Sequence, residues 1–262
     1  MDSPIGIFDS GIGGLTVFQE IRRRLPAENL IYVGDTARVP YGTKSPETVI
    51  RYSREIVQFL LKQRVKLIVV ACNTASAFAL PSLEQEFSVP ILGVIKAGVQ
   101  GGLKASRKKQ LGVIGTEGTI RSRSYEVEIQ RCEPTAKVTS LACPLFVPLV
   151  EEGWMETEAA TLIAETYLGP LRGEIDTLIL GCTHYPLLKK IIQKVVGPTV
   201  TLIDSAEETS SAVVNLLKER QLVKERGPGS EQFFVTDSPE RFLKVGKLFV
   251  DRLEQVEKIT EI

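Results

Sequence analysis

Short apolar runs recur through the first part of the chain, at residues 5–8, 29–34, 66–71 and 91–95. They are rich in Ile, Val and Leu, and β-branched residues favour strands. Each run is apolar at nearly every position rather than at every second one, which is typical of strands buried on both faces of a parallel sheet. The pattern therefore predicts a set of parallel strands.

A helix is predicted over residues 46–63, between the second and third of these runs. Ser45 is a favourable N-cap, and Pro46 has a backbone already suited to the first helical turn. The apolar positions fall on one stripe of the helix, at Val49, Ile50, Ile56, Val57, Leu60 and Leu61. Strand, helix and strand in this order predict βαβ units.

The same organisation begins again further along the chain. Predicted strands span residues 111–115, 137–142, 177–181 and 199–204, with a helix over 156–168. The spacing also repeats: Cys72 follows Asp9 by 63 residues, and Cys182 follows Gly115, at the matching point of the second half, by 67. We therefore predict two similar doubly wound α/β domains with mostly parallel sheets.

The first predicted domain comprises residues 1–95 plus 206–262, and the second comprises residues 96–205. The final segment contains a helix, a strand and a last helix that begins at Pro239, and we expect it to pack back on the first domain. In open α/β sheets, ligands bind beyond the carboxyl ends of the strands. We therefore expect the active site in the cleft between the two domains.

Charge and hydropathy argue against several kinds of partner. The 262 residues include 32 Lys+Arg and 32 Asp+Glu, so no charge excess favours nucleic acid. No run approaches the ~18 apolar residues of a membrane span, and the N-terminus does not resemble a secretory signal. We expect a cytoplasmic protein without nucleic-acid or membrane partners, in which the four cysteines are thiols rather than disulfides.

Two cysteines stand at matching places. Cys72 in "ACNTAS" and Cys182 in "GCTHYP" each follow an apolar strand and precede a polar stretch that is expected to open a helix. A helix N-terminus favours a thiolate, although a buried cysteine is often inert. His184, the only histidine, could pair with Cys182 or be structural. Zinc needs three or four ligands and no local spacing supplies them, so no metal site is predicted.

The remaining polar motifs have simpler interpretations. "DSGIGG" at residues 9–14 lacks the third glycine of the dinucleotide fingerprint, since position 16 is Thr. Asp9 itself, at the end of a buried strand, is costly to bury unless it is used. Asp35 is suited to a turn or a helix cap. We assign no chemistry to Cys132 or Cys143 and expect Trp154 to pack in the core.

Two thiols on opposite faces of one bound carbon suit stereoinversion. One thiolate removes a proton and the other thiol delivers one, since an ordinary thiol pKa of about 8.5 keeps both forms accessible near neutral pH. The carbanion then needs oriented donors, and hydroxyls and amides near the strand ends could supply them. These are Ser10, Asn73, Thr74, Thr116, Thr119 and Thr183. No lysine stands in a recognisable pyridoxal-phosphate setting, so we expect a cofactor-free route.

Seven segments carry a family resemblance. In order and spacing, the motifs "GIFDSGIGGLTV", "YVGDTARVPYG", "VVACNTASA", "GVIGTEGTI", "ACPLFVPLVEEGW", "LGCTHYPLL" and "LIDSAEETS" resemble those of glutamate racemases. The resemblance runs from about residue 5 to 215 and continues weakly through "FFVTDSPERF". It implies pyridoxal-independent interconversion of L- and D-glutamate, which supplies D-glutamate for bacterial peptidoglycan, by a protein that is often a homodimer.

The resemblance also implies roles for individual residues. Cys72 and Cys182 would be the acid/base pair, with Cys72 serving the D-form and Cys182 the L-form. Asp9 and His184 would assist them, and Glu151 matches a further acidic residue of the family. The implied substrate contacts are Asp9, Ser10, Pro40, Tyr41, Gly42, Asn73, Thr74, Thr116, Thr119, Thr183 and His184.

The sequence departs from the family pattern at the junction of the predicted domains. Residues 96–98 stand where a Pro-Gly pair is common, and Gly118 stands where Ala is usual. Three alternatives remain open. They are an aspartate or hydantoin racemase, a thiol-ligated metal-binding regulator, and a binding protein that keeps the fold without the activity.

Overall fold

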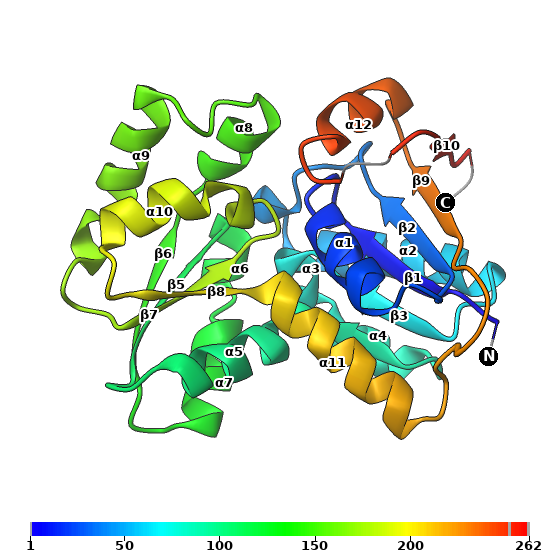
Figure 1. The fold of residues 1–262 in the computed structure, drawn as a ribbon, viewed down its shortest axis with the longest axis horizontal. Helices are drawn as coiled ribbons and strands as arrows, with labels where there is room; N and C mark the ends of the chain where they lie inside the picture. The colour runs from blue at the N-terminus through cyan, green and yellow to red at the C-terminus, as the bar shows by residue number, and fades with distance from the viewer. Residues whose placement is uncertain (1, 251–252, 261–262) are drawn as a thin grey trace.

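The computed structural model describes residues 2–250 and 253–260, which form two halves, each built around a parallel sheet (Figure 1). The first half begins with β1 (Ile5–Asp9), α1 (Leu15–Arg24), β2 (Leu30–Gly34), the 3₁₀ helix η1 (Tyr41–Thr43), α2 (Pro46–Lys62), β3 (Leu67–Val70), α3 (Asn73–Phe78), α4 (Leu80–Glu86) and β4 (Ile91–Gly93). The chain crosses to the second half through α5 (Val94–Ala105).

The second half continues with β5 (Gln110–Gly115), α6 (Glu117–Arg121), α7 (Ser124–Cys132), β6 (Lys137–Ala142), α8 (Phe146–Glu151), α9 (Glu158–Leu168), η2 (Gly169–Leu171), β7 (Thr177–Gly181), η3 (Tyr185–Leu188), α10 (Lys189–Val196) and β8 (Thr201–Asp204). The chain then returns through α11 (Ser205–Glu219) to β9 (Glu231–Val235), α12 (Pro239–Gly246) and β10 (Glu257–Lys258).

The two sheets repeat one strand order. The second sheet runs β6-β5-β7-β8, and the first contains β2-β1-β3-β4 in the same relative order, extended at one edge by β9 and β10. Every described pairing between strands is parallel. The predicted fold class, two similar doubly wound α/β units with mostly parallel sheets, is therefore confirmed.

Local sequence explains how these elements form. Ser45 caps α2 by accepting a hydrogen bond from the Thr48 backbone N–H, and Pro46 occupies the first turn. The central strands β1, β3 and β7 are buried at every position, because helices cover both faces of each sheet (Figure 1). The continuous apolar runs of the sequence follow from this double covering.

The C-terminal segment joins the two halves. β9 adds to the first sheet as a parallel neighbour of β2, and α11 packs against both α1 of the first half and α5 at the crossing (Figure 1). The predicted domain boundaries at residues 95 and 206 fall just inside the first turns of α5 and α11. The division into domains at these residues remains a prediction.

Two local expectations need correction. The stretch after Cys182, which was expected to open a helix, first forms the 3₁₀ turn η3, and α-helix follows only from Lys189. In this turn the buried Tyr185 hydroxyl donates to the Cys143 carbonyl. Trp154 was expected in the core but is 55% exposed. It lies in the short polar turn between α8 and α9, where its backbone N–H closes the end of α8 on Leu149.

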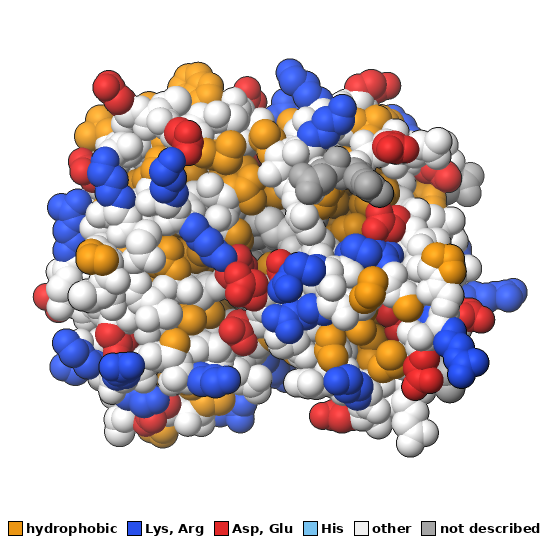
Figure 2. All heavy atoms as spheres, in the orientation of Figure 1, with side chains coloured by type: hydrophobic (Ala, Val, Ile, Leu, Met, Phe, Trp, Pro, Cys, Tyr) orange, Lys and Arg blue, Asp and Glu red, His pale blue; other side chains and the backbone are white. Residues whose placement is uncertain are grey.

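Figure 2 shows acidic and basic side chains interspersed over one face of the molecule, in keeping with equal numbers of the two. Among residues 2–250 and 253–260, no helix is long and apolar enough to cross a membrane.

Leu60→Ala should destabilise the protein by about 2–5 kcal/mol, because the Leu60 side chain is fully buried in α2 and its loss leaves a cavity under β1. Chemical denaturation measures the free energy of unfolding. Leu162→Ala is the matched control, since Leu162 is 66% exposed on α9 and should change stability by no more than about 0.5 kcal/mol. Equal effects of the two substitutions would contradict the described packing.

Candidate active site

The candidate site lies at the carboxyl ends of the central strands of both sheets. Asp9 ends β1, Cys72 follows β3, and Cys182 follows β7. β3 and β7 occupy equivalent positions in the two sheets, so the two thiols are equivalent in topology. This is the arrangement that the repeated spacing of the sequence predicts.

Cys72 caps the N-terminus of α3. The Ala75 backbone N–H donates to the thiol sulfur at 3.4 Å, and the thiol lies 3.7 Å from the Ser10 hydroxyl oxygen, to which it donates. Burial, followed by the negative charge of Asp9, raises the pKa of Cys72 to about 12. Charge on Cys182 acts in the same direction. In this structure Cys72 therefore rests as a thiol.

Asp9 is the acidic partner on the same side. Its Oδ2 accepts the Gly11 backbone N–H at 2.9 Å, while Oδ1 has no partner among the residues that the structure describes. Burial raises the pKa of Asp9, and the charge of His184 opposes that rise. The carboxyl group of Asp9 therefore binds a proton more readily than an exposed aspartate does.

Cys182 has different neighbours from Cys72. Its sulfur lies 3.9 Å from Nδ1 of His184, and Nε2 of His184 lies 3.1 Å from Oε1 of Glu151. The other oxygen of Glu151 pairs with Arg241 of α12 at 3.2 Å. A line of interactions thus runs from a surface arginine in the first half through a carboxylate and an imidazole to the second thiol.

His184 is charged in this setting. Burial disfavours the imidazolium, but hydrogen bonds to Cys182 and Glu151 outweigh that effect and raise the pKa of His184 from its ordinary 6.5 to about 10. Hydrogen bonds and charge from His184 also help to hold the pKa of Glu151 low despite its burial. The positive charge of this imidazolium therefore lies directly beside the Cys182 sulfur.

Hydroxyl groups join the two halves next to the thiols. The Thr74 hydroxyl of α3 lies 2.8 Å from that of Thr116 and 3.2 Å from that of Thr119, and the latter two are 3.0 Å apart. Two glycines permit this approach. A Cβ on Gly42 would lie 2.8 Å from the Thr116 side chain, and one on Gly118 would lie 2.8 Å from the Gly42 carbonyl oxygen.

The loop after β1 also meets the second half closely. A Cβ on Gly13 would lie 2.3 Å from the Thr183 hydroxyl and 2.4 Å from Nδ1 of His184, so no larger residue fits there without movement. Thr16 of α1 donates to the Thr183 carbonyl at 3.1 Å. These contacts bring Thr183 and His184 against the same loop that carries Asp9 and Ser10.

Tyr41 is held by a residue to which the sequence assigned a simpler role. Its hydroxyl donates to Asp35, which is fully buried and also accepts from Arg38 at 2.7 Å and Thr236 at 2.9 Å. Asp35 is thus an anchor for the loop at residues 38–43 and not a simple turn cap. Tyr41 is also only 1% exposed, so this contact fixes its side chain inside the first half.

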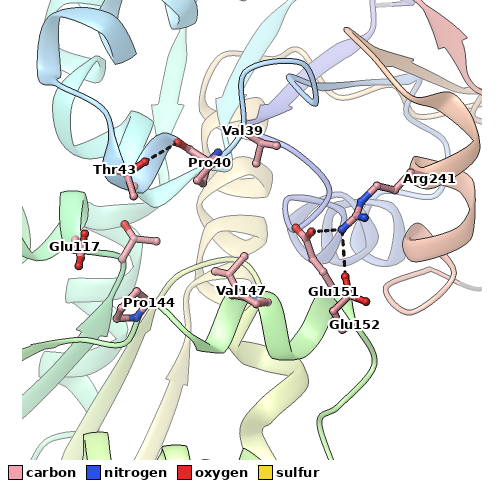
Figure 3. A pocket seen from close by; sticks show the side chains of 12 residues that line it. Val39, Pro40, Thr43, Glu117, Pro144, Val147, Glu151, Glu152 and Arg241 are labelled. Atoms are coloured by element: carbon pink, nitrogen blue, oxygen red, sulfur yellow. Dashed lines mark hydrogen bonds and ion pairs between the residues drawn. The ribbon is translucent and has the colours of Figure 1, made fainter.

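A cavity of about 330 Å³ opens between the halves (Figure 3). Val39 and Pro40 line it from the first half, and Pro144 and Val147 line it from the second. Of the residues predicted for the site, Pro40, Gly42, Thr116 and Glu151 line this cavity. The thiols do not line it and are only 6% and 5% exposed, so they are nearly closed off from solvent in this structure.

Three residues of this region were not predicted from the sequence. Arg241 reaches Glu151 from the C-terminal segment, where "SPERF" contains no pattern that indicates a site. It also lines the cavity, where Figure 3 shows it beside Glu151 and Glu152. Tyr125 hydrogen-bonds Asn73 at 2.7 Å from an otherwise apolar helix face. Asp35 lies just past β2, at a strand end like Asp9. That position in the sequence could have indicated its role next to the site.

Within the described part of the chain, no group of three or more His, Cys, Asp and Glu side chains is arranged to hold a metal ion. The other two cysteines take no part in the site. Cys132 is exposed at the end of α7, and Cys143 is buried, where burial and charge on Cys182 raise its pKa to about 12.

Comparison with known proteins identifies the class. The family model described as Asp/Glu/Hydantoin racemase matches residues 5–213, which include every residue predicted for the site. The chain belongs to this family.

Individual members of the family are similar to this chain over nearly its whole length. A glutamate racemase from Geobacter metallireducens is 55% identical over 248 residues, covering 94% of this chain and 92% of that protein. The crystal structure of glutamate racemase isoform RacE1 from Bacillus anthracis matches with a TM-score of 0.95 at 41% identity, covering 98% and 97% of the two chains. A Francisella tularensis glutamate racemase in complex with D-glutamate matches with a TM-score of 0.93 at 40% identity, covering 99% and 98%.

His184 should remain protonated across the range of about pH 5 to 8 in which an ordinary histidine titrates. Because it is the only histidine, its imidazole signals in NMR spectra are unambiguous, and they should stay constant over that range. Glu151→Gln removes the negative charge that is hydrogen-bonded to His184, so it should lower the midpoint of the His184 titration into the range of about pH 5 to 8. A wild-type midpoint near pH 6.5 would contradict the assigned charge.

The free energy of unfolding should also depend on pH, because the pKa of His184 differs between the folded and unfolded states. Since the pKa of His184 is raised on folding, its stabilising contribution is complete below the ordinary value and is lost as pH rises through the folded value. The unfolded state titrates alike in both proteins, so the difference in unfolding free energy between wild type and Glu151→Gln should shrink as pH rises above the variant's own His184 midpoint, and this part of it should be lost above pH about 10.

Proposed function

We propose that this protein is a cofactor-independent glutamate racemase that interconverts L- and D-glutamate by proton transfer at Cα. The observation that carries the proposal is the pair of buried thiols, Cys72 and Cys182, at equivalent ends of β3 and β7. Glutamate is favoured as the substrate because relatives that are 55% and 50% identical to this chain are glutamate racemases. One of the matching structures, from Francisella tularensis, is described in complex with D-glutamate.

In the proposed L-to-D direction, the Cys182 thiolate removes the Cα proton, and the C–H electron pair stays on the substrate as a carbanion delocalised into the α-carboxylate. The Cys72 thiol then delivers its proton to the opposite face of Cα. The products are D-glutamate, a Cys182 thiol and a Cys72 thiolate. The reverse reaction exchanges the two roles, so atoms and charges balance in both directions.

The neighbours of each thiol suit this chemistry. In the proposed mechanism, the His184 imidazolium stabilises the negative charge that the Cys182 sulfur carries when it acts as the base, and Glu151 orients and stabilises that imidazolium. On the other side, Cys72 rests as a thiol that can donate, and Asp9 is available to accept its proton when Cys72 must act as a base. Donors for the substrate carboxylates are proposed to come from Ser10, Asn73, Thr74, Thr116, Thr119 and Thr183 and from the backbone N–H groups of Tyr41 and Gly42. Pro40 has no N–H, and its proposed contact with the substrate is apolar.

The proposed cellular role is supply of D-glutamate for peptidoglycan in the cytoplasm, by a homodimer, as the family resemblance implies. Growth of a strain that requires D-glutamate, after it receives this gene, tests the role. The molar mass in solution tests the dimer.

Incubation with L-glutamate in D2O tests the activity directly. Two monoprotic bases predict loss of optical rotation, with deuterium at Cα of the newly formed D-glutamate but little in the L-glutamate recovered early in the reaction. L-aspartate under the same conditions should react far more slowly. Unchanged rotation with no Cα deuterium would refute racemase activity on glutamate, and faster reaction of aspartate would point to the other branch of the family.

Cys72→Ser and Cys182→Ser should each lower kcat/KM by at least about 10²–10⁴-fold, the usual contribution of a positioned acid or base. A serine hydroxyl is a much weaker acid than a thiol and cannot supply the base at neutral pH. Cys132→Ser is the matched control, because Cys132 is exposed at the end of α7, which leads into the amino end of β6 and not from the carboxyl end of a strand, and it should keep full activity. A normal rate in either active-site variant would remove that cysteine from the mechanism.

A further inference from the structure

The Asn73 side chain is buried, but only half of its amide is satisfied. Its Oδ1 accepts a hydrogen bond from the Tyr125 hydroxyl at 2.7 Å. Its Nδ2 has no hydrogen-bond partner in the described part of the protein. A buried amide N–H without a partner costs free energy and calls for an explanation, and a ligand that accepts from it is one such explanation.

Asn73 is well placed to meet such a ligand. It is the first residue of α3 and directly follows Cys72, and its neighbour Thr74 belongs to the hydroxyl cluster with Thr116 and Thr119. The two arms of a planar amide point in different directions, so the bond from Tyr125 to Oδ1 turns Nδ2 away from Tyr125. The opposite orientation of the amide would present an oxygen to an anionic substrate, which is unfavourable.

The side chain of Tyr125 is itself tightly packed. It comes from α7 of the second half, and only 2% of it is exposed. A Cβ added to Gly181 would lie 3.1 Å from the Tyr125 ring, and one added to Gly98 would lie 3.5 Å from its hydroxyl. The ring is therefore held between β7 and α5. Burial, followed by charge on Cys182, raises the pKa of Tyr125, so its hydroxyl stays protonated and can donate.

We propose that Tyr125 is a positioning residue that holds the Asn73 amide with its Nδ2 facing a carboxylate of the substrate. The inference rests on the proposed function and adds a residue of the second half that orders a binding group of the first. Because the hydrogen bond crosses between the halves, the donor is correctly oriented only while the halves are together. Tyr125 thus links the substrate contact beside Cys72 to the strand that carries Cys182.

Tyr125→Phe removes only the hydroxyl and should raise KM for both glutamate enantiomers about tenfold, equivalent to ~1.4 kcal/mol. The value of kcat should change by less than about threefold, since the amide contact is present in the substrate complex as well as in the transition state. In an Asn73→Ala background, Tyr125→Phe should cause no further rise in KM, because the two residues act through one contact. A purely structural role of Tyr125 would not raise KM while leaving kcat nearly unchanged.

Tyr185→Phe is the matched control. Tyr185 is also fully buried, and its hydroxyl donates to the Cys143 carbonyl at 2.8 Å, so the variant loses a comparable bond without touching Asn73. It should lower the melting temperature about as much as Tyr125→Phe while KM changes by less than about twofold.

Three outcomes would overturn the proposal. An unchanged KM in Tyr125→Phe, with normal racemisation by the wild type, removes Tyr125 from substrate binding and leaves the proposed function intact. An equal rise in KM in the Asn73→Ala background shows that Tyr125 acts through another group. A wild-type protein that neither binds nor racemises glutamate refutes the proposed function and this inference together.

Discussion

Removal of ionisable groups from water is the constraint on which this site depends. Two thiols, one carboxylate and one imidazole are nearly or fully buried at the meeting point of the sheets. Burial alone disfavours the charged form of each group. Each of the four groups has a specific partner: the Gly11 N–H for Asp9, Glu151 for His184, the Ala75 N–H for Cys72, and the His184 imidazole for Cys182. These contacts offset part of the cost of burial.

The same constraint explains the close contact between the halves. Charged groups stay dry only if the loops around them pack tightly, and glycines allow it at Gly13, Gly42 and Gly118. Gly118 is a place where the sequence departs from the common family pattern, and in this structure a methyl group there would press against the Gly42 carbonyl and Thr74. The departure therefore has a local physical reason, since the loop before α2 lies directly on α6.

Much of the fold could be predicted because buried parallel strands have a strong apolar signal and α2 carries its own cap and proline. The two thiols could be predicted because each stands at a strand end and their spacing repeats. The residues that hydrogen-bond to the site residues could not be predicted from the sequence. Arg241 lies ninety residues beyond Glu151 in the chain, and Tyr125 looks like one more apolar residue of a helix. Their roles depend on which elements meet in space, and single-chain periodicity does not encode that.

The repeated topology does not give the site two equivalent sides. Cys72 has a helix N-terminus, the Ser10 hydroxyl and the carboxyl group of Asp9 as neighbours, whereas Cys182 has an imidazolium held by an ion pair. L- and D-glutamate have equal free energies in water, so a racemase must show equal kcat/KM in the two directions whatever its asymmetry. Unequal surroundings can then alter only how kcat and KM are divided for each enantiomer. The different neighbours of the two thiols are therefore compatible with racemisation, because they change the stability of the bound states and not the overall equilibrium.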